Sequence, residues 1–456
     1  MTLNALVDVP GIRVGHHTAT GDGYLTGTTV VLAPDLGMTA SVDVRGGGPA
    51  THETDLLDPS AAVESVHALV LTGGSAYGLA ACSGVMLGLE ERGTGLPVGA
   101  QPGELVPIVP GAALFDLGRG GEFRARPTAD FGRSALQAAL DMDSANLESG
   151  SASIGSIGAG CGAVAGNLKS GVGQASIVLA NGMVVAALVV CNAAGSPIDP
   201  GNGDLLGARH LLAVDGRRPS AVAADRLAAL NEAVYRRPDR PVFAFDGDNR
   251  GPENPIQHTT LAVVATSAPL TKSRCARMAA VAHDGMARAV NPVHTMFDGD
   301  LVFGVSTGGA GSAPAGKEPD PLEFHEILTA AADVVTRSIV RGMLAARSTS
   351  TAAGSWPSWG ELAHGSQQSI DDWLIRFGDR QGPAVTSSPL GTLDEVRSVS
   401  QSLPVTPRRR ENRRWAGPCG LASLVCPPDR PIFRSDKAAI ASREDCDRMA
   451  GLRGHS

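Results

Sequence analysis

The chain has 456 residues, 43% of them hydrophobic, so it exceeds the usual length of one domain and can bury a large core. Its formal charge of −8 argues against a general binder of nucleic acid or anionic membranes, because such a binder needs a basic face. Glycine is abundant, at 57 residues, but no G-X-Y period accompanies it, which excludes collagen.

The composition changes near residue 346. All four tryptophans follow this point, and residues 347–456 carry 14 Arg, one Lys and 12 acidic residues, a net charge of +3. Residues 1–346 hold 47 of the 57 glycines. We therefore predict a compact domain over residues 1–346 and a Ser/Arg/Pro-rich tail over 347–456 that is mostly disordered.

The cysteines and the apolar stretches exclude several classes of protein. Seven widely spaced cysteines without a CxxC pair predict neither a metal site nor a disulfide framework, and no motif calls for a cofactor. The N-terminus lacks the basic and apolar regions of a signal peptide. The longest apolar stretch, residues 177–191, is too short to span a bilayer. We expect a cytoplasmic protein that binds neither membranes nor nucleic acid.

The first half of the chain alternates strand-like and helix-like segments. An apolar run over 66–72 predicts a strand that ends at a glycine pair, and residues 75–91 predict a helix rich in small residues. Two apolar runs, 175–180 and 183–191, flank Asn181-Gly182, which is a strong hairpin signal.

The second half continues the alternation. Its predicted elements are a helix over 221–236, a strand over 260–267, a helix over 271–290, a strand over 301–306, and a closing helix over 321–346 capped by Asp320. A short helix over 369–377 is the one element expected in the tail. Hairpin strands mixed with helices predict a layered α+β domain.

Two polar segments adjoin the strands of the second half. His258 and Thr259 precede the strand over 260–267, and by themselves they fit the ordinary start of a strand, since Thr favours strands. The segment from His294 to Asp300 ends in Asp-Gly-Asp, which fits a polar turn. It lacks the alternating oxygen ligands of a calcium loop.

Together these segments resemble a known family. HTTLAVVATSAPLTK, VAHDGMARAV and HTMFDGDLVF follow one another in the order of the DmpA-like aminopeptidases, the L-aminopeptidase/D-esterase family that includes nylon-oligomer hydrolase. The upstream segments DVRGGGP, LTGGSAYGL and VVCN also resemble family motifs. The resemblance covers roughly residues 5–346 and leaves out the tail.

The resemblance implies an αββα sandwich, two sheets covered by helices, and a homo-oligomer, a tetramer in the family. It also implies a precursor that cuts itself at the His258–Thr259 bond, giving a subunit of residues 1–258 and a second subunit that starts at Thr259. A new N-terminal Thr carries its own base, because an α-amine with a pKa near ~8 is partly neutral at cellular pH.

Three further roles follow from the resemblance. Asn192 matches a family Asn near the nucleophile, whose amide can donate to a developing oxyanion. A turn residue at the end of a strand is the competing interpretation of Asn192. Asp298 and Asp300 match residues that orient the nucleophile and its amine, and two carboxylates there would tune the pKa of that amine.

The substrate side of the site is less well marked. The Gly73-Gly74-Ser75 turn opens a helix, so its N–H groups are candidates to bind a substrate carboxylate or oxyanion, with Tyr77 close by. Nylon-oligomer hydrolase has a functional Lys after a Gly, where this chain has Asn167. Lys169 follows two positions later, so either the loop brings Lys169 in or the role is lost. His258 also departs from the Asn or Gly that relatives carry before the nucleophile.

These residues predict an aminopeptidase or amidase that hydrolyses short peptides or amides with a free amino end through an acyl-enzyme on Thr259. One alternative is acyl transfer of the ornithine acetyltransferase type, in which the acyl group passes to an amine. The other is an unprocessed, non-catalytic homologue. The sequence does not distinguish L-peptides, D-esters, β-peptides and nylon-like amides as substrates.

Overall fold

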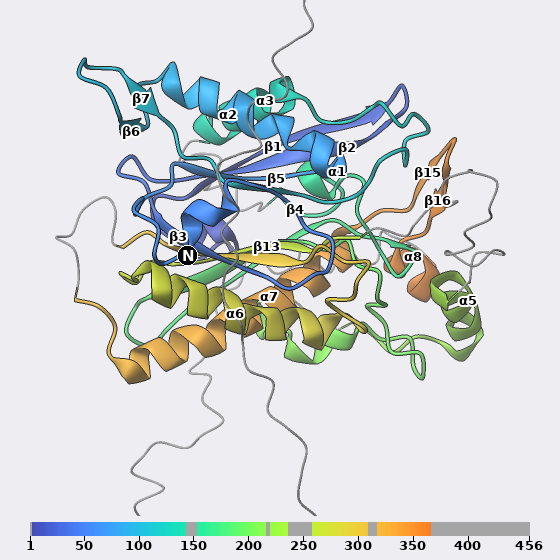
Figure 1. The fold of residues 1–456 in the computed structure, drawn as a ribbon. Coiled ribbons are helices and arrows are strands. Elements are labelled where there is room, and N and C mark those ends of the chain that lie inside the picture. The colour runs from blue at the N-terminus through green and yellow to red at the C-terminus, as the bar shows by residue number, and fades with distance from the viewer. Residues whose placement is uncertain (1, 143–152, 216–218, 236–257, 309–316, 366–456) are drawn as a thin grey trace, which may run out of the picture. The chain divides into compact units, whose positions relative to one another are not determined.

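The computed structural model describes residues 2–142, 153–215, 219–235, 258–308 and 317–365 (Figure 1). All of them belong to one compact unit, Met1–Ser387. The helix expected over 369–377 and the rest of the tail from residue 366 onward lie outside the described residues.

Two five-stranded sheets form the centre of this unit. The first has the order β1 (Arg13–Gly21), β2 (Tyr24–Leu32), β5 (Ala68–Thr72), β8 (Gly111–Ala113), β4 (Ala50–His52). The second has the order β11 (Val172–Val178), β12 (Val184–Val190), β13 (Leu261–Thr266), β14 (Leu301–Ser306), β3 (Thr39–Val44). In the second sheet β13 and β14 run parallel, while the other neighbours are antiparallel.

Helices cover the outer face of each sheet (Figure 1). Helices α2 (Ala80–Glu90) and α3 (Ala129–Leu140) pack on the first sheet, and α6 (Lys272–Ala289) and α7 (Pro321–Ala345) pack on the second. The predicted αββα sandwich is therefore confirmed.

Side-chain alternation along the strands produces three separate layers of core. On β12, Val185, Ala187 and Val189 face α6 and α7, whereas Ala186 and Leu188 face the other sheet. Successive residues of a strand point to opposite faces, so a strand that is buried on both sides is apolar throughout. This is why the central strands contain so few polar residues.

The remaining elements are short or lie at the edges. They are the helices α1 (Ser75–Gly78), α5 (Ala224–Tyr235) and α8 (Trp359–His364), the short strands β6 (Leu96–Pro97), β7 (Leu105–Val106), β9 (Val164–Ala165), β10 (Leu168–Lys169), β15 (Thr349–Thr351) and β16 (Gly354–Trp356), and 3-10 turns at Leu6–Asp8, Thr54–Leu57, Gly158–Gly160, Leu206–His210 and Ala213–Asp215.

Most predicted elements are present, with one division. The hairpin at Asn181-Gly182 joins β11 to β12, and Asp320 caps α7 by accepting hydrogen bonds from two backbone N–H groups of its first turn. The helix predicted over 75–91 is divided at Leu79 into α1 and α2. At Gly78 a Cβ would lie 1.8 Å from the carbonyl oxygen of Gly73, so only glycine permits this close return of the chain.

The folded part of the chain continues beyond Ala346, which corrects the predicted boundary. The β15–β16 hairpin and α8 follow α7, and the Trp359 side chain is fully buried among the core residues beneath α7. Its Nε1–H donates to the carbonyl oxygen of Gly203 at 2.9 Å. Composition and the extent of the family resemblance assigned residues 347–365 to the tail, because neither reports the burial of single aromatic residues.

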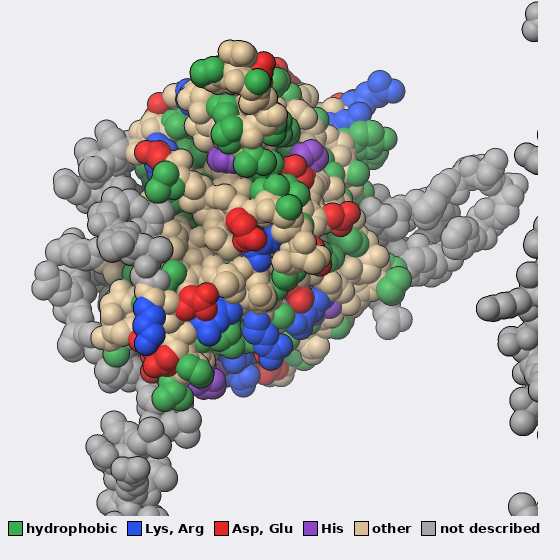
Figure 2. Space-filling model, turned by 60° about the vertical axis from the view of Figure 1, so that its left-hand side comes forward, with side chains coloured by type: hydrophobic (Ala, Val, Ile, Leu, Met, Phe, Trp, Pro, Cys, Tyr) green, Lys and Arg blue, Asp and Glu red, His purple; other side chains and the backbone are tan. Residues whose placement is uncertain are grey.

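The surface is mixed in character. On the face in Figure 2, acidic, basic and apolar side chains are interspersed. Among the described helices, none combines the length and apolarity needed to cross a bilayer.

The burial of Trp359 predicts a large loss of stability on truncation of this side chain. Trp359→Ala should lower the free energy of unfolding by about 3–5 kcal/mol, because it leaves a cavity and an unpaired carbonyl. Trp356→Ala, which removes a half-buried Trp of the neighbouring hairpin, should cost clearly less. Urea denaturation of both variants measures the difference. Equal, small losses would show that α8 adds little to the fold.

Candidate active site

The site lies where the ends of three strands meet. Strands β13 and β14 pair in parallel with Leu261 opposite Leu301, and the pairing extends backward to a bridge between His258 and Asp298. Strand β12 ends beside them, with Val190 opposite Leu261. The residues just before β13 and β14 and just after β12 therefore converge.

Thr259 is almost fully buried and bonded on both sides. Its N–H donates to the backbone oxygen of Asn192 at 2.6 Å, and its hydroxyl donates to the carbonyl oxygen of His258 at 2.6 Å. That same carbonyl oxygen accepts the N–H of Gly299 at 2.9 Å. The hydroxyl thus lies beside the carbonyl of the peptide bond that precedes it, and a backbone donor already polarises this carbonyl.

Glycines make this close approach possible. A Cβ on Gly299 would lie 2.6 Å from the Thr259 Oγ1 and 2.7 Å from the carbonyl oxygen of Gly48. A Cβ on Gly46 would lie 2.2 Å from the backbone nitrogen of Asp300. The N–H groups of Gly46 and Gly48 donate to the carbonyl oxygens of Asp300 and Asp298. The segment DVRGGGP therefore wraps the turn that carries the two carboxylates.

Asp298 and Asp300 both lie beside the His258–Thr259 segment, on the turn that precedes β14. Asp298 accepts hydrogen bonds from the Ala194 N–H and from the backbone and hydroxyl of Thr295. Asp300 accepts the Thr260 N–H at 2.7 Å. Burial raises the pKa of Asp298, and the neighbouring carboxylate of Asp300 raises it further. The charge of Asp300 therefore works against the ionisation of Asp298.

Asn192 approaches Thr259 through its backbone. Its side-chain Oδ1 accepts hydrogen bonds from Arg119 at 2.6 Å and from the Val164 N–H at 3.1 Å, and its Nδ2 donates to the Phe115 oxygen at 3.3 Å. The amide is thus held within the protein in the uncut chain. Donation from the Asn192 amide to an oxyanion stays a prediction. The contact between Asn192 and Arg119 is one that the sequence gave no reason to expect.

The Gly73-Gly74-Ser75 turn does not offer the free donors that were predicted. The N–H groups of these residues donate to Gly27 O, Asp116 Oδ1 and Leu114 O at 2.9, 2.7 and 2.8 Å. Helix α1 then lasts only four residues. The Tyr77 ring is half exposed and lies under the guanidinium of Arg126, 3.6 Å from its centroid. The N–H groups of this turn already donate within the protein, and their predicted role toward a substrate stays a prediction.

A sequence profile of peptidase family S58 matches residues 4–356. The chain belongs to peptidase family S58. An uncharacterized aminopeptidase of Mycobacterium tuberculosis is 43% identical over 361 residues, 76% of this chain and 95% of that protein. A 6-aminohexanoate-oligomer endohydrolase of Kocuria sp. is 29% identical over 311 residues, 66% of this chain and 74% of that enzyme. The resemblance drawn from the motifs is confirmed.

Solved structures share the fold of this S58 chain. A β-aminopeptidase of Burkholderia sp. aligns with a TM-score of 0.57 and 21% identity, covering 83% of this chain and 96% of that one. The L-aminopeptidase D-Ala-esterase/amidase of Ochrobactrum anthropi, described as a variant of the Ntn hydrolase fold, aligns with a TM-score of 0.51 and 18% identity, over 78% and 91% of the two chains.

Lys169 of this S58 peptidase is fully buried in a charged cluster. Its ammonium donates to the carbonyl oxygens of Ser170, Ala163 and Gly160 at 2.7, 3.1 and 3.4 Å. Burial lowers the pKa of Lys169 to about 7. Burial also lowers the pKa of Arg119 to about 10 and raises that of Asp116 to about 6. The cluster thus holds ionisable groups that can change charge near neutral pH.

Asn167 does not take the place of this lysine. It adopts a positive φ of 63° in the turn between β9 and β10, and its Nδ2 donates to the Val234 oxygen at 3.0 Å. The turn points Asn167 toward α5 and buries Lys169 on the other side. The geometry therefore favours Lys169 over Asn167 as the residue that faces the interior.

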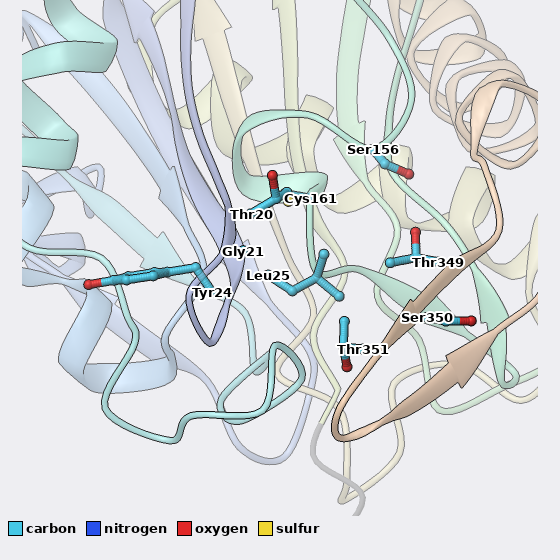
Figure 3. A pocket seen from close by; sticks show the side chains of 9 residues that line it. All are labelled: Thr20, Gly21, Tyr24, Leu25, Ser156, Cys161, Thr349, Ser350 and Thr351. Carbon is cyan, nitrogen blue, oxygen red and sulfur yellow. The ribbon is translucent and has the colours of Figure 1, made fainter.

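A cavity of about 290 Å³ lies beside this cluster and is shown in Figure 3. The β1–β2 turn, Cys161 and β15 line it, and the phenol of Tyr24 points away from its centre. Thr351 of β15 donates to the Arg119 carbonyl oxygen at 2.6 Å, so one wall of the cavity is bonded to the loop that holds Asn192. Thr259 is not among the residues that line the cavity.

The depressed pKa of Lys169 predicts a pH-dependent contribution to stability. Above pH 7 the folded chain leaves Lys169 neutral, while the unfolded chain keeps it protonated up to about pH 10. The unfolded state then binds more protons, so stability rises with pH by up to about 1.4 kcal/mol per unit in this window. The free energies of unfolding of wild type and Lys169→Met, measured in the same cleavage state, isolate the effect. The stability of wild type relative to Lys169→Met should rise between pH 7 and about pH 9. A difference that does not change with pH would contradict it.

Proposed function

We propose that this S58 chain is a precursor that cuts its own His258–Thr259 bond and then acts as an aminopeptidase with Thr259 as the nucleophile. Membership of a peptidase family supports hydrolysis of peptide bonds as the class of reaction. The observation that carries the finer proposal is the Thr259 hydroxyl, 2.6 Å from the carbonyl oxygen of its own preceding bond.

In the proposed self-cleavage, the Thr259 oxygen attacks the carbonyl carbon of His258 and the hydroxyl gives up its proton. The Gly299 N–H, 2.9 Å from the carbonyl oxygen, stabilises the negative charge that develops there. The C–N bond breaks as the proton reaches the departing nitrogen, which leaves an ester between His258 and the Thr259 side chain. The amine of Thr259 is free from this point, and water then hydrolyses the ester, which releases the His258 carboxylate and restores the Thr259 hydroxyl.

His258 is compatible with this chemistry. Burial, followed by the positive charge of Arg119, lowers the pKa of His258 to about 3. Its ring is therefore neutral at cellular pH and adds no second positive charge next to the scissile bond. In this respect the neutral His258 resembles the uncharged Asn or Gly that relatives carry before the nucleophile.

In the proposed turnover, the new amine accepts the hydroxyl proton as Thr259 attacks the substrate carbonyl, and it then donates that proton to the leaving amine. Asp298 and Asp300 provide the negative charge that attracts the free amino end of the enzyme or of a bound substrate. Short peptides or amides with a free amino end are the proposed substrates, and the relatives' names extend this class to β-peptides and 6-aminohexanoate oligomers. A cytoplasmic location and a homo-oligomer complete the proposal.

Substitution of the nucleophile tests the proposal directly. Wild-type chain should resolve into fragments of roughly 26 and 20 kDa, estimated from the mean residue mass, whereas Thr259→Ala should stay at the full 46.5 kDa. Thr260→Val keeps shape and the backbone donor to Asp300 and should still be cut. Denaturing gels with intact-mass analysis measure all three. The same two fragments from Thr259→Ala would exclude Thr259 as the self-processing nucleophile.

The cut protein then distinguishes hydrolysis from acyl transfer. It should release p-nitroaniline from L-alanine p-nitroanilide and leave the N-acetylated compound intact, because only the first has a free amino end. Formation of acetylglutamate from acetylornithine and glutamate, without hydrolysis of the anilide, would favour the acyltransferase instead.

A further inference from the structure

Two histidines link the Asp300 carboxylate to the backbone of β3 through a chain of hydrogen-bond contacts. His294 Nδ1 lies 2.8 Å from Asp300 Oδ2, and His294 Nε2 lies 3.2 Å from His283 Nδ1. The other nitrogen of His283, Nε2, lies 3.0 Å from the backbone oxygen of Asp43 on β3. The two rings are edge-on to each other, 4.6 Å apart at 80°. Asp300 and His283 are buried, whereas His294 is partly exposed.

This chain of hydrogen bonds needs three protons, one more than two neutral histidines supply. It ends in an acceptor on both sides, the Asp300 carboxylate and the Asp43 carbonyl, with three contacts between them. Each contact requires one proton, and a neutral imidazole carries one. Three contacts therefore require a third proton, held either by an imidazole or by Asp300.

The neighbours of each group decide where this proton lies. Asp300 accepts backbone N–H groups from Thr260 at 2.7 Å through Oδ1 and from His294 at 3.1 Å through Oδ2, so both of its oxygens already accept hydrogen bonds. His283 is fully buried, and burial lowers its pKa to about 4, so it is the poorer place for a charge. His294 is partly exposed and touches Asp300 directly. It is the position at which an imidazolium is compensated.

We propose that His294 is held as an imidazolium between the Asp300 carboxylate and a neutral His283, and that this charge positions and tunes the carboxylate pair for the Thr259 amine. The inference rests on the proposed function for its catalytic consequence, but not for the position of the proton. His283 then carries its proton on Nε2, donates it to the Asp43 carbonyl, and accepts from His294 through Nδ1.

The other charged groups around the chain are consistent with this assignment. Asp43 Oδ1 lies 3.3 Å from His283 Nε2, but Arg45 binds the same oxygen at 2.7 Å and compensates it. Arg45 also disfavours a positive charge on His283. Asp298, from the same turn as Asp300, adds negative charge at the far end. The positive charge is thus favoured at His294 and disfavoured at His283.

The catalytic consequence follows from the charge balance beside Thr259. Asp298 and Asp300 with a neutral His294 present two negative charges, which would hold the new amine as an ammonium. The imidazolium reduces this to one. The amine therefore loses its proton at a lower pH and can act as a base. His283 and His294 are positioning residues in this account, since they act through Asp300.

The position of the proton can be measured without any activity. In uncut Thr259→Ala protein at pH 7, ¹⁵N-histidine NMR should show His294 protonated on both ring nitrogens and His283 on Nε2 only. His294→Gln in the same background assigns the signals, and a neutron diffraction map of the Thr259→Ala protein gives the same answer without a substitution at either histidine. A singly protonated His294, or a proton on Asp300, would overturn the proposal.

The pH profile of the cut enzyme tests the consequence. In His294→Gln, the acid limb of kcat/KM for L-alanine p-nitroanilide should move up by about one pH unit, because a positive charge near the amine is lost. His283→Leu, which removes the acceptor for His294, should move it in the same direction. His283→Gln retains an acceptor and a donor and should restore the wild-type limb. A histidine with a purely packing role would lower kcat without moving the limb, and that result would overturn the tuning role.

The proposed function and the protonation of His294 can each fail without the other. If wild-type chain is never cut, the proposed function fails, while the NMR measurement still decides the protonation of His294. If wild-type chain is cut and active but His294 is neutral, the proposed function stands and this inference fails.

Discussion

The parallel pairing of β13 with β14 is the constraint on which the site depends. In a parallel pair, residues that precede the two strands lie at the same edge of the sheet. The register that places Leu261 beside Leu301 therefore places His258 and Thr259 beside Asp298 and Gly299. A shift of one residue would turn every side chain of β13 to the other face, which the two apolar cores on either side forbid. The two apolar cores therefore fix which residues lie at the site.

Close packing of backbone against backbone is the second requirement. The carboxylate turn, the glycine segment before β4 and the His258–Thr259 bond approach one another more closely than side chains would allow. Backbone N–H groups can then reach the carbonyl oxygen of His258 and the oxygens of the turn. A site assembled from backbone donors in a buried, preorganised setting costs little reorganisation during reaction. The buried side chains of Lys169 and Asp116, whose pKa values lie at about 7 and about 6, add a second layer that titrates near neutral pH.

The sequence was most informative about elements with a clear apolar period and about residues within the family motifs. Apolar alternation gave the strands and helices, and the motifs around Thr259 and Asp298 placed both residues in one site through resemblance alone. The sequence was uninformative about side-chain partners. Nothing in the loop that holds Arg119 marks it as a partner of Asn192, and the glycine turn at Gly73 resembles a ligand-binding turn although its donors are already used. Composition also hid the burial of Trp359.

The histidines illustrate the same limit. His283 and His294 both lie within the motifs that carry the family resemblance, VAHDGMARAV and HTMFDGDLVF. Their proposed role depends on hydrogen-bond partners that are distant in sequence, Asp43 and Asp300. Counting donors and acceptors along a buried chain needs coordinates, since no local pattern reports how many protons three contacts must share.

The central claim is that the bond before Thr259 is the one that the chain cuts. N-terminal sequencing of the smaller fragment from purified wild-type protein tests it most directly. The account predicts that this fragment begins Thr-Thr-Leu-Ala, the residues that lead from the site into β13. A fragment that begins at any other residue, or a single chain whose only N-terminus is that of the full sequence, would contradict it.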